Sequence, residues 1–228
     1  MSIIQDPFAH RPKEKGRLIV YGSSTSRVRK VLWVAAEAGV EVERVDIPTI
    51  ELKKQSWFAD INPKCTVPVM RDGNLVLNES NTIISYICQV YGKHLYPESP
   101  DLLALSWQWL EYGETTVVPT VAPIWFGKTK NMSFSTRTSP ANEDEINACV
   151  PKCLKAWQGV EEHLAKGKKD FILGDEFSMA DITLGIQADR MKKNNGFDFE
   201  ELKFKHFLNI SRWIENLESQ TKFSKYGE

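Results

Sequence analysis

Residues 17–47 read RLIVYGSSTSRVRKVLWVAAEAGVEVERVDI, and this stretch decides the fold. The β-branched run at 17–21 ends at a glycine and a cluster of hydroxyl residues, which predicts a strand followed by a tight loop. Apolar residues then recur at steps of three and four from Val28 to Gly39, the period of a helix with a glycine at its end. The alternating segment 41–47 predicts a second strand. Together these elements predict a β-α-β unit with parallel strands.

The next segment completes a small α/β domain. Residues 49–60 are compatible with a weak helix that ends before Pro63, because the residue preceding a proline avoids the helical region. Two short apolar runs within 67–77 flank an Asp-Gly turn, the pattern of a β-hairpin. Apolar residues between 79 and 91 again follow the helical period. The predicted order is βαβαββα.

Proline-punctuated sequence then separates this domain from an all-helical one. We expect a flexible leader at 1–16, the α/β domain at 17–95, a linker at 96–101 and the helical domain at 102–228. Within it we expect helices at 102–126, at 142–166, from Met179 and at 206–217, with a loop at 128–141. Pro119 and Pro123 predict a kinked or broken end of the first helix. Ser178 and Asp181 predict a capping box before the third.

Composition narrows the possible partners. The chain has 29 Lys and Arg against 30 Asp and Glu, so it lacks the positive field that holds a nucleic acid. The four cysteines form no C-x-x-C pair, so we expect no metal and a reducing, cytoplasmic compartment. No apolar run has the length of a signal-peptide core or a membrane span, so we expect a soluble protein with no membrane partner.

Val67-Pro68 is a candidate cis peptide bond at the start of an apolar strand. Proline cannot donate to a strand ladder, so we expect it at the edge of the sheet. A cis bond here could turn the N–H and C=O of Val67 outward, where they could pair with an extended peptide. The alternative is an ordinary trans proline.

Glu79 and Ser80 open a predicted helix directly after the hairpin. Backbone N–H groups and the helix dipole at this position attract a carboxylate, while the Glu79 side chain can bind an amine. The pair therefore suits the head of an α-amino acid. The alternative is that Ser80 only caps the helix and Glu79 only complements its dipole.

The hydroxyl cluster 23–26 lies between the first strand and the first helix. A thiol at this place would meet a positive helix end and a hydroxyl donor, which both favour the thiolate. The alternative is an ordinary Ser/Thr cap.

These features together resemble the cytosolic glutathione transferases, in particular serine- or threonine-type, bacterial theta-like members. The resemblance covers roughly residues 17–218 and is carried by four motifs, at 21–33, 62–68, 78–86 and 171–183. It implies a thioredoxin-like α/β domain that binds glutathione, an all-α domain with a pocket for an electrophile, and a homodimer. It also implies that Val67 and Pro68 bind the cysteinyl part of glutathione and that Glu79 and Ser80 bind its γ-glutamyl head.

The catalytic position departs from the family pattern. In serine-type members the activating hydroxyl stands fourteen residues before the glycine that ends the first helix, and counting back from Gly39 gives a threonine. We therefore predict Thr25 as the activating residue, with Ser24 and Ser26 as alternatives. Threonine can make the same hydrogen bond, although its methyl group restricts the rotamer.

Two further sets of residues complete the predicted site. Lys53 or Lys54 would bind the glycyl carboxylate, and the sequence does not choose between them. The electrophile would contact aromatic residues of the helical domain, unless these only fill the core. They are Trp107, Tyr112, Trp125 and Phe126.

We therefore predict a glutathione transferase that activates the thiol of reduced glutathione for attack on a small hydrophobic electrophile. Glutathione is a cosubstrate in this reaction, and no metal takes part. An isomerase, a dehalogenase or an ether-cleaving enzyme that uses glutathione is the first alternative, because the same scaffold hosts these chemistries. A non-enzymatic protein-interaction module of the same fold is the second.

Overall fold

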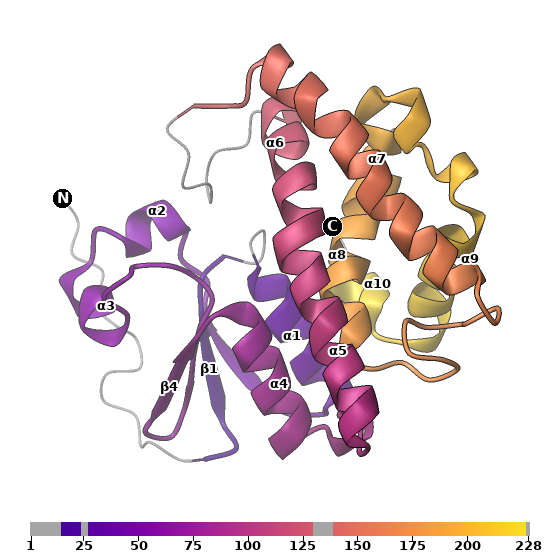
Figure 1. Ribbon diagram of the computed structural model, residues 1–228. Helices are drawn as coiled ribbons and strands as arrows, with labels where there is room; N and C mark the ends of the chain where they lie inside the picture. Colours follow the sequence, from indigo (N-terminus) through magenta and orange to yellow (C-terminus); the bar gives the residue numbers. More distant parts are fainter. Residues whose placement is uncertain (1–14, 24–26, 130–138, 227–228) are drawn as a thin grey trace. The chain divides into compact units, whose positions relative to one another are not determined.

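The computed structural model describes residues 15–23, 27–129 and 139–226 (Figure 1). The chain divides into two compact units between Lys93 and His94. The first holds a four-stranded sheet with helices, and the second is helical, which confirms the predicted fold class. The leader and linker bounds expected from the sequence stay predictions.

The sheet of the first unit is mixed. Its strands are β1 (Leu18–Tyr21), β2 (Val42–Val45), β3 (Val69–Asp72) and β4 (Leu75–Asn78). They are ordered β2-β1-β3-β4, with β1 parallel to β2 and antiparallel to β3, and with β3 antiparallel to β4. The parallel pair is the one that the β-α-β pattern predicts, and the last pair is the predicted hairpin.

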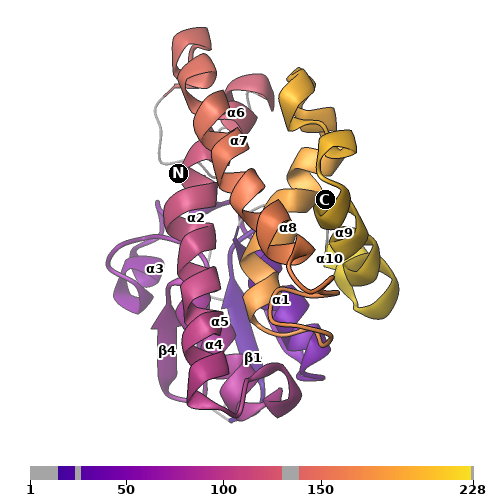
Figure 2. The ribbon, with the colours of Figure 1, turned by 45° about the vertical axis from the view of Figure 1, so that its right-hand side comes forward.

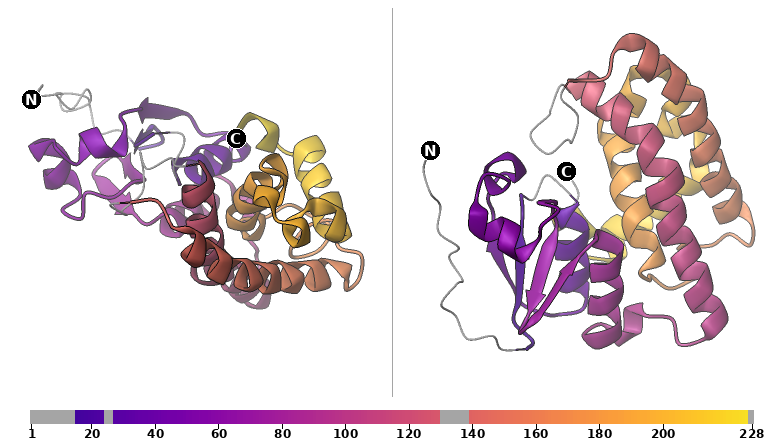
Figure 3. Two further views of the ribbon diagram at one scale, coloured as in Figure 1. Left: turned by 90° about the horizontal axis from the view of Figure 1, so that it is seen from above. Right: turned by 60° about the vertical axis from the view of Figure 1, so that its left-hand side comes forward.

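Helices cover both faces of this sheet. The helices α1 (Val28–Glu37) and α4 (Ser80–Val90) pack together on one face, and α2 (Thr49–Leu52) and α3 (Ser56–Ile61) lie on the other, as Figure 1 and the right panel of Figure 3 show. The single helix expected at 49–60 is thus two short ones.

The break between α2 and α3 has a local cause. Gln55 is extended and buried, and its side-chain amide donates to the carbonyl of Glu51 at 3.2 Å. The same carbonyl also accepts from the backbone amide of Lys54 at 3.1 Å, so the end of α2 is closed by both a main-chain and a side-chain donor.

The α2/α3 face of the sheet carries an apolar cluster. Its buried members are Tyr21, Val45, Leu52, Phe58 and Val69. Cys65 and Val67 pack against this cluster and are partly buried. The segment before β3 therefore rests on the core of the unit, which fixes its position.

A carboxylate ties the two ends of the first unit together. Asp72 is buried and accepts hydrogen bonds from the Tyr86 hydroxyl at 2.6 Å, the Tyr91 hydroxyl at 2.5 Å and the Gly16 amide at 2.9 Å. Burial acts to raise the pKa of Asp72, but the two tyrosine hydrogen bonds, the Gly16 amide and the charge of Lys15 outweigh it and lower that pKa. The start of β1 is thus held to the end of β3.

The second unit consists of helices and short helical turns. The α-helices are α5 (Pro100–Tyr112), α6 (Val118–Thr129), α7 (Glu143–Ala165), α8 (Ala180–Lys193), α9 (Leu208–Gln220) and α10 (Phe223–Tyr226). Helix α8 is buried along most of its length and packs against α5 and α9 (Figure 2). None of the helices within the described residues is long and apolar enough to cross a membrane.

We expected the prolines to kink or break the end of the first long helix. The structure instead has its irregular segment between α5 and α6, just before Pro119. Gly113–Val117, between α5 and α6, forms a π-helical segment, and Pro123 lies inside α6. Pro119 has no N–H to give to the carbonyl four residues earlier, so the disturbance lies on its N-terminal side. Helix α6 then continues to Thr129, so the expected loop does not start at residue 128; residues 130–138 lie outside the described part.

Candidate functional site

Three segments of the first unit meet at one end of the sheet. Tyr21, the last residue of β1, pairs with Val69, which in turn pairs with Asn78 at the end of β4. Val67 lies two residues before Val69 and Ser80 two residues after Asn78, so both lie just beyond the paired ends of β3 and β4. The residues after β1, those before β3 and the start of α4 therefore lie close together.

Gly22 allows this close approach. Its φ is +120°, and a Cβ built on it would lie 2.8 Å from the Cβ of Val67 and 2.9 Å from the Cγ2 of Val28. No other residue type fits both the conformation and the space. The sequence predicts this glycine only as the end of a strand, because its closeness to Val67 depends on residues far along the chain.

The Val67-Pro68 peptide bond is cis, as the resemblance implies. The expectation that this proline lies at an edge of the sheet is wrong, because β3 is an inner strand between β1 and β4. Pro68 precedes Val69, the first paired residue of β3, so its missing N–H costs the ladder no hydrogen bond.

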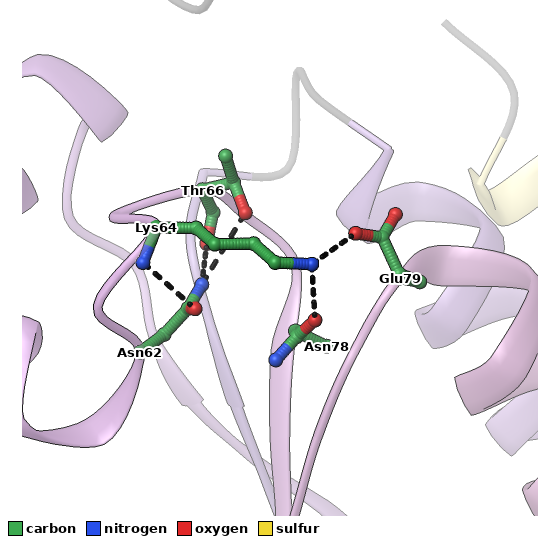
Figure 4. A network of polar contacts seen from close by, with 5 residues as sticks. All are labelled: Asn62, Lys64, Thr66, Asn78 and Glu79. Atoms are coloured by element: carbon green, nitrogen blue, oxygen red, sulfur yellow. Dashed lines mark hydrogen bonds and ion pairs between the residues drawn. The ribbon is translucent and has the colours of Figure 1, made fainter.

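Asn62 organises the loop that leads to this bond, as Figure 4 shows. Its side-chain amide donates to the carbonyl oxygen of Thr66 at 2.9 Å, and its Oδ1 accepts from the amide of Lys64 at 3.3 Å. The backbone carbonyl of Asn62 also accepts from the amide of Cys65 at 2.8 Å, and Cys65 has a φ of +50°. A buried asparagine thus holds the loop in a turned conformation just before Val67.

Glu79 precedes α4 in a sparsely populated backbone conformation, with φ 72° and ψ 113°. Within the described part of the chain its side chain does not cap the helix. The carboxylate is exposed and meets Lys64, whose Nζ lies 3.1 Å from Oε1 and 3.5 Å from the Oδ1 of Asn78 (Figure 4). The exposed carboxylate of Glu79 is therefore paired with the ammonium group of Lys64, and a ligand amine could bind it in the same way.

Ser80 is the first residue of α4, and a lysine from α1 contacts it. The Nζ of Lys30 donates to the Oγ of Ser80 at 3.3 Å, and both side chains are buried. The N–H groups and dipole of the helix start and the ammonium group all favour an anion at this place. A carboxylate site beside an amine site suits an α-amino acid head.

The predicted thiol-activating residues Thr25, Ser24 and Ser26 lie outside the described residues, so their roles stay predictions. The count that selected Thr25 rests on Gly39 as the end of the first helix. That glycine follows α1 directly after its C-cap and has a φ of +70°, the conformation of a helix-ending glycine.

Lys53 and Lys54 follow α2 and are exposed. The structure distinguishes them, because the Nζ of Lys54 forms an ion pair with the Oε1 of Glu51 at 2.7 Å. Lys53 is therefore the better candidate for a second carboxylate.

The four aromatic candidates of the second unit do not form one group. Trp107 and Trp125 stand 18 residues apart, about 27 Å along a helix at about 1.5 Å per residue. Tyr112 donates its hydroxyl to the carbonyl of Ala156 on α7 at 2.8 Å, a packing contact. Trp125 and Phe126 are neighbours on α6 with ring centroids 4.9 Å apart. We therefore keep Trp125 and Phe126 as the candidate pair for one pocket.

Metal-ligating side chains do not cluster within the described residues. Among them no group of three or more His, Cys, Asp or Glu side chains could hold a metal ion. Burial raises the pKa of the Cys88 and Cys153 thiols to about 12, so both stay protonated at neutral pH.

Comparisons with known proteins give matches over most of the chain. Residues 26–90 match the glutathione S-transferase N-terminal domain, and residues 143–216 match the C-terminal domain. A probable glutathione S-transferase GSTF2 of Oryza sativa subsp. japonica is 32% identical over 170 residues, which cover 72% of this chain and 76% of the relative. Glutathione S-transferase D6 of Drosophila melanogaster is 27% identical and covers 87% of this chain and 86% of its own length. The theta class glutathione S-transferase of Xanthomonas axonopodis pv. citri, solved with glutathione bound, has the same fold, with a TM-score of 0.77. Its sequence is 24% identical, and the match covers 91% of this chain and 95% of the Xanthomonas chain.

Proposed function

The chain belongs to the glutathione S-transferase family, and we propose on that premise that it conjugates reduced glutathione to small hydrophobic electrophiles at the site in its first unit. The start of α4 carries this proposal. There an exposed carboxylate at Glu79 and a buried, positively charged helix start at Ser80 stand side by side. This arrangement complements the ammonium and carboxylate groups of a γ-glutamyl head.

The rest of the tripeptide would lie extended along Val67. This residue and Ser80 both lie two residues beyond the paired ends of β3 and β4, which supports a ligand that has its head at Ser80 and runs past the Val67 backbone. Main-chain hydrogen bonds to such a strand end are a common way to bind a peptide. The glycyl carboxylate would then pair with Lys53, since Lys54 is engaged by Glu51.

The sulfur would be ionised by a hydroxyl of the 24–26 segment, with Thr25 as the first candidate and Ser24 and Ser26 as alternatives. A hydrogen bond to a charged group contributes about 1.5–3 kcal/mol, which corresponds to roughly one to two pKa units. Starting from a thiol pKa near 8.5, this gives a pKa of about 6.5–7.5, so a large share of the thiol is ionised at neutral pH. Thr25→Ala is expected to lower kcat far more than it weakens glutathione binding.

The electrophile would contact Trp125 and Phe126, the aromatic pair on α6. On the same resemblance we propose a homodimer in the cytoplasm. Light scattering of the purified protein tests the dimer, which is expected at twice the 26.0 kDa of one chain.

Two measurements on the full-length protein test the proposed function. Calorimetry should detect binding of glutathione, and S-methylglutathione should bind as well because the site contacts the peptide and not the thiol proton. Steady-state kinetics with a chlorinated nitrobenzene should show glutathione-dependent loss of chloride. Absence of binding heat at millimolar glutathione contradicts the site, and binding without turnover of several electrophiles contradicts conjugation.

A further inference from the structure

Lys30 is a buried lysine at the predicted glutathione site, and neither the sequence motifs nor the comparisons assign it a role. It lies in the first turn of α1, and its side chain is 0% exposed. Its Nζ lies 3.3 Å from the Oγ of Ser80, 50 residues further along the chain. Lysine side chains are almost never fully buried without a specific partner, which makes this contact notable.

We propose that Lys30 is a positioning residue for the γ-glutamyl carboxylate of glutathione, which it serves by orienting the Ser80 hydroxyl and by placing a positive charge behind it. This inference rests on the proposed function, because it assigns a role within the same binding site.

The orientation follows from hydrogen-bond chemistry. An ammonium group can only donate, so the Ser80 oxygen is the acceptor in this contact. The hydroxyl proton must then point away from Lys30 and is available to an acceptor on the other side. A ligand carboxylate at the start of α4 is such an acceptor.

The charge acts over a short distance. A carboxylate oxygen bound to the Ser80 hydroxyl would lie about 2.7 Å from Oγ, and Oγ lies 3.3 Å from Nζ. The two opposite charges would therefore be at most about 6 Å apart, in a buried region where salt screens little. Because the carboxylate is remote from the sulfur, this attraction is the same in ground and transition states and should change KM without changing kcat.

Lys64 lies where the ammonium group of the γ-glutamyl head is expected to bind. It is exposed and pairs with Glu79, the residue expected to bind the ligand ammonium. The two lysines thus have opposite relations to the ligand, since Lys30 attracts the carboxylate while Lys64 occupies the place of the amine.

A tripeptide that lacks only the γ-glutamyl α-carboxylate, 4-aminobutanoyl-cysteinyl-glycine, tests the assignment by calorimetry. The unmodified protein should bind it at least about tenfold more weakly than glutathione. Lys30→Met should bind glutathione about tenfold more weakly than the unmodified protein does, yet bind the truncated tripeptide with nearly the same Kd. Its kcat at saturating glutathione should be unchanged. Lys93→Met, the same substitution at an exposed lysine of the same unit, is the control and should alter neither Kd.

The outcomes separate the possible failures. A Lys30→Met protein that loses affinity for both tripeptides equally would show a role in folding only and would overturn the inference. If the unmodified protein binds no glutathione, the proposed function itself fails. If Lys30→Met does not fold, the unmodified protein still decides, because equal affinity for the two tripeptides overturns the carboxylate site.

Discussion

Two helix starts in this molecule, those of α4 and α8, handle the same electrostatic problem in opposite ways. The N-terminus of any helix leaves N–H groups without partners and carries a partial positive charge. At α8 the chain supplies its own anion, because Asp181 lies fully buried beside the start of the helix. At α4 the acidic residue Glu79 turns outward to Lys64, and a second cation, Lys30, lies at the first residue of the helix.

The Asp181 carboxylate accepts four hydrogen bonds beside the start of α8. Oδ1 accepts from the amide of Ile172 at 2.8 Å and from the indole of Trp213 at 2.9 Å. Oδ2 accepts from the amide of Ser178 at 3.0 Å and from its hydroxyl at 3.3 Å. Since the carboxylate links three separate segments, its function is to hold the second unit together.

The α4 start has the opposite character. It lacks an internal carboxylate among the described residues and presents a positive helix start beside an exposed acid. Under the proposed function, the difference between the two starts means that the α4 start can take a ligand carboxylate because the chain places no carboxylate of its own there. Substitutions at the two starts should therefore separate into effects on stability and effects on affinity.

The largest effect is expected for Asp181→Ala. It leaves several buried donors without an acceptor, so the free energy of unfolding should fall by about 3 kcal/mol or more. Urea unfolding followed by fluorescence measures this change. The Kd for glutathione of the folded protein should stay within about twofold, and a large loss of affinity at unchanged stability would refute the division of roles.

The pH dependence of stability gives a second test at the same residue. Burial raises the pKa of Asp181 to about 6, against the lowering effect of its hydrogen bonds. Because this value lies above the unfolded one, the folded state binds the proton more tightly, so the contribution of Asp181 is full below about pH 4 and is lost as the pH rises through about 6. The stability deficit of Asp181→Asn should therefore shrink between pH 4 and pH 6, as unfolding curves across this range would show. A deficit that grows with pH contradicts this pKa shift.

Ser80→Ala should have the next largest effect, and on affinity. Loss of one hydrogen bond to a charged ligand group should raise the KM for glutathione about tenfold, which is about 1.4 kcal/mol, with kcat little changed. Stability should fall much less than for Asp181→Ala, because the Ser80 hydroxyl accepts one described hydrogen bond, from Lys30, whereas the Asp181 carboxylate accepts four. Steady-state kinetics with varied glutathione checks the first point, and a kcat that falls in parallel would place Ser80 in the chemical step.

Local patterns explain how much of these two sites the sequence could predict. Helix α4 and the residues Glu79 and Ser80 at its start were predicted, because the periodicity and the hairpin before it are local signals. The return of the Asp181 carboxylate to the Ser178 amide was predicted for the same reason and is confirmed. A capping box also requires the Ser178 hydroxyl to accept from the amide of Asp181. That prediction is wrong, because the hydroxyl accepts from the amide of Ala180 instead.

Contacts between distant segments could not be predicted in this way. Lys30 stands in a run of basic residues and has the sequence pattern of an exposed helix position, but the packing of α1 against α4 buries it. The Trp213 indole reaches Asp181 from 32 residues away. The close approach of Gly22 to Val67 likewise depends on how β1 and β3 pair. A single sequence shows none of these neighbours.

A third helix start, that of α7, provides an intermediate case. Asn142 accepts from the amide of Glu145 at 2.9 Å, and the Glu145 carboxylate accepts from the amide of Asn142 at 3.0 Å, which closes the start with an exposed capping box. Asn142→Ala should lower the free energy of unfolding by about 1 kcal/mol. Thermal unfolding measures this, with Lys152→Ala on the exposed surface of α7 as a control expected to change little. A loss as large as that of Asp181→Ala would show that burial is not what separates the two closed starts.

The smallest effect is expected for Lys64→Ala, at the open start. The ion pair between Lys64 and Glu79 has 61% and 67% of its side-chain surface exposed, so its contribution to stability should be below about 0.5 kcal/mol. The ligand ammonium must displace or share with Lys64 to reach Glu79, so removal of the lysine should tighten glutathione binding about twofold.

Calorimetry at low and high salt can resolve this change. The gain should fade as salt rises, because both charges are exposed to solvent and are screened. Glu79→Gln removes the other partner of the pair and should weaken binding instead, since it deletes the group that receives the ammonium. If Lys64→Ala weakened glutathione binding tenfold, Lys64 would itself bind the ligand, and the α4 start would be an anion site on both sides of Glu79.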